Sequence, residues 1–340
     1  MKRVMFVTNS LTGGGAERSM NMVCNGLFAR GWNVAIVPIN QGPRDQVIPS
    51  CEIIPLQRKK QGGFFETALA IIHFNRLVKT WKPDVIILNC ELPELLAATL
   101  FRRVKFVVLQ HTSKPWAGRK VLGRLIRKIL SHRKTSWVAV SSHLTIWPKS
   151  ETPERILLNP VLERKKRPRS YKTNELERLV FVGRLSNEKR PEIILEVSKE
   201  TNIPILLIGE GSMSESLKVS SRMDGIIAEF AGQIRDPWTR IQEGDLLIIP
   251  SAFEGDGLVV IEALMNEVPF LLADIPDFRR FDFPKLNYCS SVQEYKSVID
   301  IYRIDLNKLL IPREISKQLI EGRSLAKVVD SWERFLLRQA

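Results

Sequence analysis

Two carboxylates and a glycine turn are the residues of this chain whose types and spacing best suit ligand binding. Glu254 and Glu262 stand eight positions apart, and a Gly-x-Gly turn at 255–257 follows the first of them. The preceding apolar run, 245–250, is typical of a buried parallel strand, so we expect Glu254 in a loop at the carboxyl end of a strand and Glu262 in the next helix. Open α/β sheets bind ligands at that end. The backbone N–H groups that open the helix attract an anion, and carboxylates accept hydrogen bonds from hydroxyls, so the segment suits a sugar nucleotide.

A glycine run and a basic pair occupy two other expected strand–helix junctions. The run Gly13-Gly14-Gly15 lets the backbone approach a ligand closely at a helix N-terminus. It departs from the G-x-G-x-x-G dinucleotide fingerprint at Arg18, and Asn40 stands where an acidic residue is needed, which disfavours a nicotinamide site. Arg184 and Lys189 follow the first strand of the second half. They could clamp a diphosphate from two sides, and the alternative is a solvated surface pair.

One histidine has a position that favours function. His111 is expected just after the fifth strand of the first half, in a loop at the carboxyl end of the sheet. Loops at that end carry binding and catalytic residues, and histidine is the side chain that titrates near neutral pH. A structural role is the alternative. The other histidines, at positions 73, 132 and 143, have no such context.

The elements that must position these residues form two series. Short apolar runs alternate with helical patterns from residue 4 to residue 140, which predicts a doubly wound parallel α/β sheet. The pattern lapses over a polar, basic stretch that we interpret as a linker, and a second α/β series follows. Two such domains would leave a cleft between the carboxyl ends of their sheets. We expect a first domain over 1–161, the linker over 162–177, a second domain over 178–323 and a final helix over 324–340.

The composition is that of a basic globular protein. At 340 residues the chain is long enough for two domains, and 44% hydrophobic residues are ordinary. Lys and Arg (51) exceed Asp and Glu (37) by 14, which favours phosphorylated ligands, anionic membranes or nucleic acid without choosing among them. The four cysteines have no paired spacing, so we expect reduced thiols rather than a disulfide or zinc framework. There is no secretory pattern and no long apolar stretch, so we expect a cytoplasmic protein.

Residues 102–134 contain eleven basic residues and no acidic one. An apolar stripe in the same segment predicts an amphipathic helix that could lie on an anionic membrane surface. The alternative is a domain helix that buries the stripe against the sheet. Nucleic acid is disfavoured because no recognised binding module accompanies the charge. The stripe comprises Val121, Leu122, Leu125, Ile126, Ile129 and Leu130, and the predicted membrane-binding residues are Arg119, Lys120, Arg124, Arg127, Lys128 and Trp116.

Taken together, three segments resemble glycosyltransferase family 4. They are Gly-Gly-Gly-Ala-Glu-Arg at 13–18, Gly-Arg-Leu-x-x-x-Lys at 183–189 and Phe-Glu-Gly-x-Gly-Leu-x-x-x-Glu-Ala at 253–263. The resemblance runs in order over nearly the whole chain. It implies the GT-B architecture, in which two Rossmann-like domains face a central cleft and a C-terminal helix crosses back to the N-terminal domain. It also implies a nucleotide-sugar donor held mainly by the second domain, an acceptor on the first, and no metal or other cofactor.

The resemblance assigns a role to each matching residue. Arg184 and Lys189 would neutralise the donor diphosphate, and Glu262 would accept hydrogen bonds from the ribose hydroxyls. Glu254 would position the transferred sugar and stabilise charge on it, while His111 would contact that sugar or donate a hydrogen bond near the reacting centre. The remaining predicted donor-binding residues are Gly14, Gly15, Gly255, Gly257 and Leu258.

Two departures from the family pattern affect the donor site. Asp256 stands where the family more often has an aromatic or apolar residue. A carboxylate near a diphosphate is unfavourable unless it is paired or turned away. The segment 274–280 lacks the glycine pair that many members carry there. The local donor contacts therefore do not follow from the resemblance.

The resemblance leads us to expect a retaining glycosyltransferase. It would move a hexose or an N-acetylhexosamine from a nucleotide sugar, a UDP-sugar in preference to a GDP-sugar, to a lipid-linked or cell-surface glycan such as O-antigen or capsule. With the basic helix, this places the protein at the inner face of the cytoplasmic membrane. The alternatives are a nucleotide-sugar epimerase or phosphorylase with the same fold, and a non-catalytic basic protein that binds membrane or nucleic acid.

Overall fold

The chain forms two compact domains. The structure is a computed structural model that describes residues 2–11, 14–42, 51–59, 63–161 and 175–339. The first domain takes residues 1–162 and 322–340, and the second takes 163–321. Gly13 and residues 162–174 of the predicted linker lie outside the described residues.

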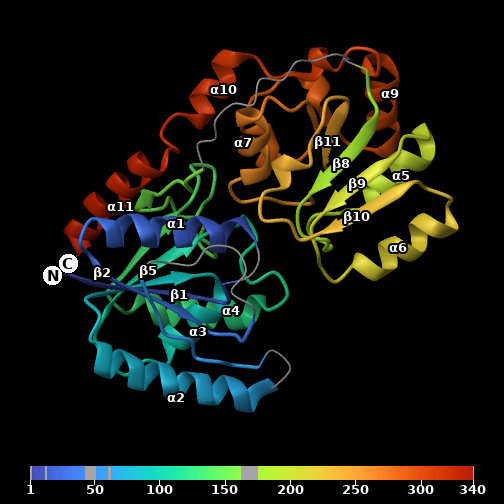
Figure 1. The fold of residues 1–340 in the computed structure, drawn as a ribbon. Coiled ribbons are helices and arrows are strands. Elements are labelled where there is room, and N and C mark those ends of the chain that lie inside the picture. Colours follow the sequence, from blue (N-terminus) through green and yellow to red (C-terminus); the bar gives the residue numbers. More distant parts are fainter. Residues whose placement is uncertain (1, 12–13, 43–50, 60–62, 162–174, 340) are drawn as a thin grey trace. The chain divides into compact units, whose positions relative to one another are not determined.

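A parallel sheet forms the centre of the first domain (Figure 1). Within the described residues it has seven strands in the order β3-β2-β1-β4-β5-β6-β7, so the order reverses between β1 and β4. The longer strands are near-continuous apolar runs, as parallel strands covered on both faces require. The strands are β1 (Arg3–Thr8), β2 (Asn33–Pro38), β3 (Glu52–Ile53), β4 (Val85–Asn89), β5 (Lys105–Gln110), β6 (Thr135–Ala139) and β7 (Arg155–Ile156).

Helices cover both faces of this sheet. One face packs against α1 and α11, through buried residues such as Leu27 and Val329. The other packs against α2, α3 and α4, through Phe74, Leu96 and Ile126. The helices are α1 (Gly15–Ala29), α2 (Gly63–Trp81), α3 (Glu91–Ala98), α4 (Lys120–Ser131) and α11 (Leu325–Gln339).

The last helix, α11, belongs to the first domain although it follows the second in sequence. Its Trp332 is buried, and its ring centroid lies 5.7 Å from that of Phe6 in β1. Glu333 accepts hydrogen bonds from the indole N–H of Trp32 and from the Arg30 guanidinium, both at 2.8 Å. The hydrogen bond from Trp32 has the largest effect on the pKa of Glu333 and the one from Arg30 follows, and both lower it from its ordinary value. Polar contacts therefore fix α11 beside α1, where Figure 1 shows it.

The second domain is also built on a parallel sheet. Within the described residues it has six strands in the order β10-β9-β8-β11-β12-β13, and the order reverses between β8 and β11. The strands are β8 (Arg178–Val182), β9 (Ile205–Ile208), β10 (Ala228–Gly232), β11 (Asp245–Ile249), β12 (Phe270–Ala273) and β13 (Tyr288–Cys289). The helices are α5 (Glu192–Thr201), α6 (Ser214–Met223), α7 (Leu258–Met265), α8 (Pro276–Arg279), α9 (Val292–Tyr302) and α10 (Arg313–Ile320), with the 3-10 turns η1 (Pro237–Thr239), η2 (Lys285–Asn287) and η3 (Leu306–Leu309).

Each domain is a Rossmann-like α/β fold, which confirms the predicted fold class. In such sheets the crevice at the strand-order reversal, at the carboxyl ends of the strands, is the usual ligand site. In the first domain this point lies after β1 and β4, and in the second it lies after β8 and β11. Among the described residues, no helix has the length and apolar character needed to cross a membrane.

Candidate active site

Lys189 and Glu254 meet at the reversal point of the second sheet. Lys189 follows β8 and Glu254 follows the neighbouring strand β11. The Lys189 Nζ atom lies 2.5 Å from Glu254 Oε1, and the Ser251 hydroxyl donates to the same oxygen at 2.9 Å. The backbone N–H of Glu254 donates to Asp277 Oδ2 at 2.7 Å. A cation, a hydroxyl and a second carboxylate thus fix both the side chain and the backbone of Glu254.

Arg184 extends from a glycine turn directly after β8. A Cβ added at Gly209 would lie 1.9 Å from the carbonyl oxygen of Gly183, so the loops after β8 and β9 pack backbone against backbone. The Arg184 side chain is half exposed and lies 3.7 Å from Glu188. The close glycine contact therefore holds the turn, while the guanidinium extends toward solvent on the same sheet edge as Lys189.

Glu262 is a buried carboxylate in α7. Its Oε2 accepts a hydrogen bond from the indole N–H of Trp238 at 2.9 Å. Trp238 lies in η1, and its backbone N–H donates a hydrogen bond to the side chain of Asp236. Trp238 was not among the site residues predicted from the sequence. The signal that could have found it is Asp236-Pro237, a typical start of a short helical turn.

The start of α7 depends on Gly257. This residue has φ +64°, and an added Cβ would lie 3.1 Å from the ring of Phe281. Both the left-handed backbone and the close ring favour glycine. Because α7 begins at Leu258, its first backbone N–H groups lie next to the Gly255–Gly257 turn.

Asp256 is buried and paired. Arg280 Nη2 lies 4.0 Å from Asp256 Oδ1 and donates a hydrogen bond to the Asp256 carbonyl oxygen at 2.7 Å. The same guanidinium lies over the ring of Phe281. The segment 274–280, which lacks the family's glycine pair, thus supplies two partners: Arg280 for Asp256, and Asp277 for the backbone N–H of Glu254. Neither contact was predicted from the sequence.

In the first domain, His111 lies at the end of a chain of polar contacts. Its Nε2 is 2.5 Å from Asn89 Oδ1, and Asn89 Nδ2 donates to Thr8 Oγ1 at 3.3 Å. Thr8 and Asn89 end β1 and β4, pair in register and are fully buried. Asn89 was not among the site residues predicted from the sequence. A polar residue that ends an otherwise apolar strand was the available signal.

Gly14 and Gly15 lie on the other side of the reversal point in the first sheet. Gly14 precedes α1, which begins at Gly15. The Gly14 N–H donates to Glu17 Oε2 at 3.1 Å, so this buried carboxylate satisfies one N–H at the helix start. The sequence analysis did not anticipate this use of Glu17.

The prediction that Arg127 and Trp116 bind a membrane is wrong. Arg127 is 3% exposed and forms an ion pair with Glu94 at 2.7 Å, and Trp116 is also 3% exposed. The reason is helical spacing, because the buried face of α4 comprises Gly123, Ile126, Arg127 and Leu130. A Cβ added at Gly123 would lie 2.4 Å from Trp116 Cγ, so glycine leaves room for the indole.

The outer face of α4 is both apolar and basic. Val121 is 81% exposed and Leu125 is 56% exposed. The other exposed residues of this face, named here the outer α4 face, are Leu122, Ile129, Arg119, Lys120, Arg124 and Lys128. Of the six apolar residues in the predicted stripe, Ile126 and Leu130 are therefore the buried ones. Such exposed apolar residues beside cations are typical of an interaction surface.

Family comparisons match both domains. Residues 13–145 match the model described as Glycosyltransferase Family 4. Residues 163–281 match the model described as Glycosyl transferases group 1. The two matches do not overlap, and each falls in a different domain.

Two relatives have names that specify glycan synthesis. The chain is 21% identical over 283 residues to the GalNAc-alpha-(1->4)-GalNAc-alpha-(1->3)-diNAcBac-PP-undecaprenol alpha-1,4-N-acetyl-D-galactosaminyltransferase of Campylobacter jejuni, covering 79% of this chain and 78% of that protein. It is 24% identical over 295 residues to the O-antigen biosynthesis glycosyltransferase WbnH of Escherichia coli, covering 81% and 82%.

Solved structures share the fold. The Anabaena protein Alr3699/HepE in complex with UDP-glucose aligns with a TM-score of 0.79 at 14% identity, covering 99% of this chain and 100% of that chain. The sucrose-phosphate synthase of Thermosynechococcus elongatus aligns with a TM-score of 0.77 at 17% identity, covering 100% of both chains. With glycosyltransferase matches in each domain and this fold, the chain belongs to the GT-B glycosyltransferases of the family 4 type.

Proposed function

We propose that the chain transfers a hexose or an N-acetylhexosamine from a UDP-sugar to a lipid-linked glycan, with retention of anomeric configuration. The observation that carries the proposal is the arrangement at the reversal point of the second sheet. There a lysine and a glutamate in contact, Lys189 and Glu254, lie beside the glycine turn that opens α7. Cations and a helix N-terminus suit a diphosphate, and a carboxylate suits sugar hydroxyls.

Each donor residue has a proposed task. Lys189 and Arg184 neutralise the diphosphate and stabilise the charge that develops on the departing nucleoside diphosphate. Glu262, held by Trp238, accepts hydrogen bonds from the ribose hydroxyls. Glu254 binds the hydroxyls of the transferred sugar and stabilises positive charge on it. With two protein cations in this role, the proposed reaction needs no divalent metal.

The first domain supplies the acceptor side of the proposal. His111 contacts the transferred sugar or donates a hydrogen bond near it, and Gly14 and Gly15 border the donor phosphate and the acceptor. The acceptor class is supported by the Campylobacter relative, whose name specifies a PP-undecaprenol-linked glycan. The outer α4 face would place the enzyme on an anionic membrane, at its cytoplasmic side, where such acceptors are embedded.

The test begins with a donor screen. UDP-glucose, UDP-galactose, UDP-GlcNAc, UDP-GalNAc and GDP-mannose are each incubated with the enzyme and a polyprenyl-diphosphate glycan, with and without EDTA. We expect turnover of one UDP-sugar that EDTA does not reduce. Lys189→Ala and Glu262→Ala should abolish that turnover, because they remove the diphosphate cation and the ribose acceptor. Full activity in both variants would overturn the assignment.

The same screen separates the epimerase alternative. An epimerase isomerises the nucleotide sugar without an acceptor, so each donor is also incubated alone and its products are resolved. A new nucleotide sugar in that reaction would replace our proposal by epimerisation. A chain that UDP and GDP at micromolar concentration do not stabilise against heat would instead be a non-catalytic protein.

A further inference from the structure

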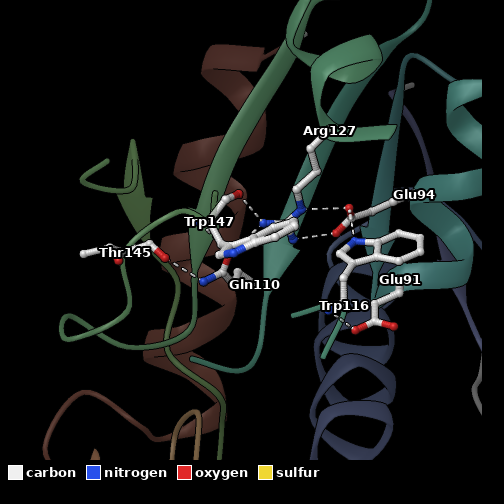
Figure 2. Close-up of polar contacts among 7 residues, drawn as sticks. All are labelled: Glu91, Glu94, Gln110, Trp116, Arg127, Thr145 and Trp147. Atoms are coloured by element: carbon white, nitrogen blue, oxygen red, sulfur yellow. Dashed lines mark hydrogen bonds and ion pairs between the residues drawn. The ribbon is translucent and has the colours of Figure 1, made fainter. Parts of the chain in front are cut away.

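Residues 111–116, the first part of the loop between β5 and α4, carry His111, and one buried cluster holds this segment at both ends (Figure 2). At the centre of this cluster Arg127 and Glu94 form a two-point ion pair. Arg127 Nη2 lies 2.7 Å from Glu94 Oε1, and Arg127 Nε donates to Glu94 Oε2 at 2.9 Å. Both side chains are 3% exposed. The pair joins α4 to α3 underneath the loop.

The first end of the loop is fixed through Gln110. Its Oε1 accepts a hydrogen bond from Arg127 Nη1 at 2.9 Å, and its Nε2 donates to the Thr145 carbonyl oxygen at 2.7 Å. Arg127 Nη1 also donates to the Trp147 carbonyl oxygen at 2.7 Å. Gln110 directly precedes His111, so these contacts fix the backbone from which the histidine extends.

The second end is fixed through Trp116. Its indole N–H donates to Glu94 Oε2 at 3.0 Å, and its backbone N–H donates to Glu91. Trp116 has φ +57°, a left-handed conformation that costs free energy in a bulky residue. Such a conformation persists only where the surroundings hold it. Glu94 thus bonds both to the arginine that fixes Gln110 and to the strained residue that closes the loop.

Stability alone does not require this arrangement. Burying two charges costs solvation, and well-packed apolar side chains often stabilise such a position as well or better. What the arginine adds is a fixed geometry, because the five N–H donors of its guanidinium point in set directions. The guanidinium also lies near the rings of Trp137 and Trp147, at 5.4 and 5.7 Å from their centroids, which limits its movement.

The histidine itself has a single orientation in this frame. Asn89 Nδ2 donates to Thr8 Oγ1, so Asn89 Oδ1 is the atom that faces His111 and accepts from Nε2–H. That contact places the ring Nδ1 on the opposite side of the imidazole. A shift of the loop backbone would displace His111 from Asn89, because the histidine is the first residue of the loop and Asn89 is fixed at the end of β4.

From these contacts we propose that the Arg127–Glu94 pair is a positioning device that holds the 111–116 loop so that His111 keeps its bond to Asn89 and its ring faces the reacting sugar. The part that concerns the sugar rests on the proposed function. Arg127 and Glu94 are positioning residues, because they act through the loop and do not touch the substrate.

The experiment compares Arg127→Lys and Glu94→Gln with a matched control, Arg178→Lys. Arg178 forms an equally direct pair with the buried Asp245 in the second domain, with both contacts at 2.9 Å. We expect kcat to fall by about 10- to 100-fold in the first two variants, because misplacing a reacting group by about 1 Å costs that much. The donor KM should change by less than about threefold, since the donor is held mainly by the second domain. The control should lose thermal stability and keep its kcat.

Two readouts do not depend on activity. Amide hydrogen exchange at 111–116 should accelerate in the Arg127 and Glu94 variants and stay unchanged in the control. The protein has four histidines, so the His111 ring signals can be assigned with His111→Gln, and they should broaden or shift in the same two variants. Trp116→Phe removes the N–H that bonds Glu94 and keeps a ring beside Gly123; it serves if the charge variants fold poorly.

The positioning role would be overturned if the Arg127→Lys and Arg178→Lys proteins, compared at matched thermal stability, did not differ. The comparison covers amide exchange at 111–116, the His111 signals and kcat. If the native enzyme turns over no nucleotide sugar, the proposed function fails instead. Exchange and the His111 signals, measured without substrate, would then still decide whether the pair positions the loop.

Discussion

At the scale of single residues, the proposed donor site includes two buried carboxylates that are fixed by partners distant in sequence. Trp238 holds Glu262 through one N–H, and Arg280 neutralises Asp256 from a segment that follows it by more than twenty residues. Their effect is to give a buried carboxylate one position, which is the condition for recognising a hydroxyl or avoiding a phosphate.

Trp238→Phe should weaken donor binding with little effect on kcat. The change keeps the ring and removes the N–H that bonds Glu262, and a hydrogen bond to a charged group contributes about 1.5–3 kcal/mol. We expect the UDP dissociation constant, measured by calorimetry, to rise by roughly tenfold or more. Tyr295→Phe is the control, because among the described residues its buried hydroxyl has no hydrogen-bond partner. Unchanged UDP affinity in Trp238→Phe would show that Glu262 does not need the indole.

The charged residues that flank the glycine turns could be placed from the sequence because their types and spacing repeat a family pattern. Their partners could not. Asn89, Trp238 and Arg280 are distant in sequence from the residues they bond, so a local signal, such as the polar end of an apolar strand at Asn89, marks one residue without identifying its partner. The prediction that Arg127 binds a membrane failed for a different reason. Within a long basic stretch, only the spacing of Arg127 from Gly123 and Leu130, four residues after one and three before the other, distinguishes it as an arginine on the buried face of α4.

At the scale of elements, α4 has two different faces. The inner face bonds α3 through Arg127, and the outer α4 face exposes apolar residues between cations. The sequence predicted the helix itself, because helical periodicity is a strong signal over twelve residues. The packing of Trp116 against Gly123 decides which apolar residues of α4 face the sheet. Periodicity alone does not predict that packing.

Removing the outer α4 face should reduce membrane binding. Val121→Ser with Leu125→Ser removes exposed apolar area, and Arg124→Glu with Lys128→Glu reverses two charges. Each basic residue near an anionic surface contributes about 1 kcal/mol, so the charge variant should bind phosphatidylglycerol vesicles at least roughly tenfold more weakly in sedimentation.

The control for vesicle binding is Val219→Ser with Met223→Ser, which removes exposed apolar residues from α6 in the second domain. Neutral phosphatidylcholine vesicles form the second arm, and the native protein should bind them less than anionic ones. Equal vesicle binding by the native and α4 variants would mean that this face does not dock on lipid.

At the scale of the whole molecule, the two-domain division follows from composition and strand alternation, because each alternating series can bury its own sheet. The role of α11 does not follow from alternation. Its apolar residues at helical spacing predict only that one face is buried, and the family resemblance supplied the domain on which it packs. In the structure, Trp332 and Leu336 lie in the core of the first domain with Phe6.

Trp332→Ala should destabilise the first domain selectively. Large-to-small changes of a buried tryptophan cost about 3–5 kcal/mol. The first of two thermal or urea transitions, or the exchange of β1 amides, should therefore shift, while the exchange of β8 amides in the second domain stays the same. Leu337→Ala, a change at a residue of α11 that is 53% exposed, is the control. An equal shift in both domains would contradict a selective role.

The position of α11 also sets an order of events during synthesis. Among the described residues, every strand and helix of the second domain lies between residues 178 and 320, whereas the first domain takes a core helix from 325–339. The second domain can therefore complete its core on the ribosome first, although its sequence is translated later. Until α11 emerges, the nascent first domain exposes the apolar surface that Trp332 will cover, and a chaperone that binds nascent chains would find its longest-lived target there.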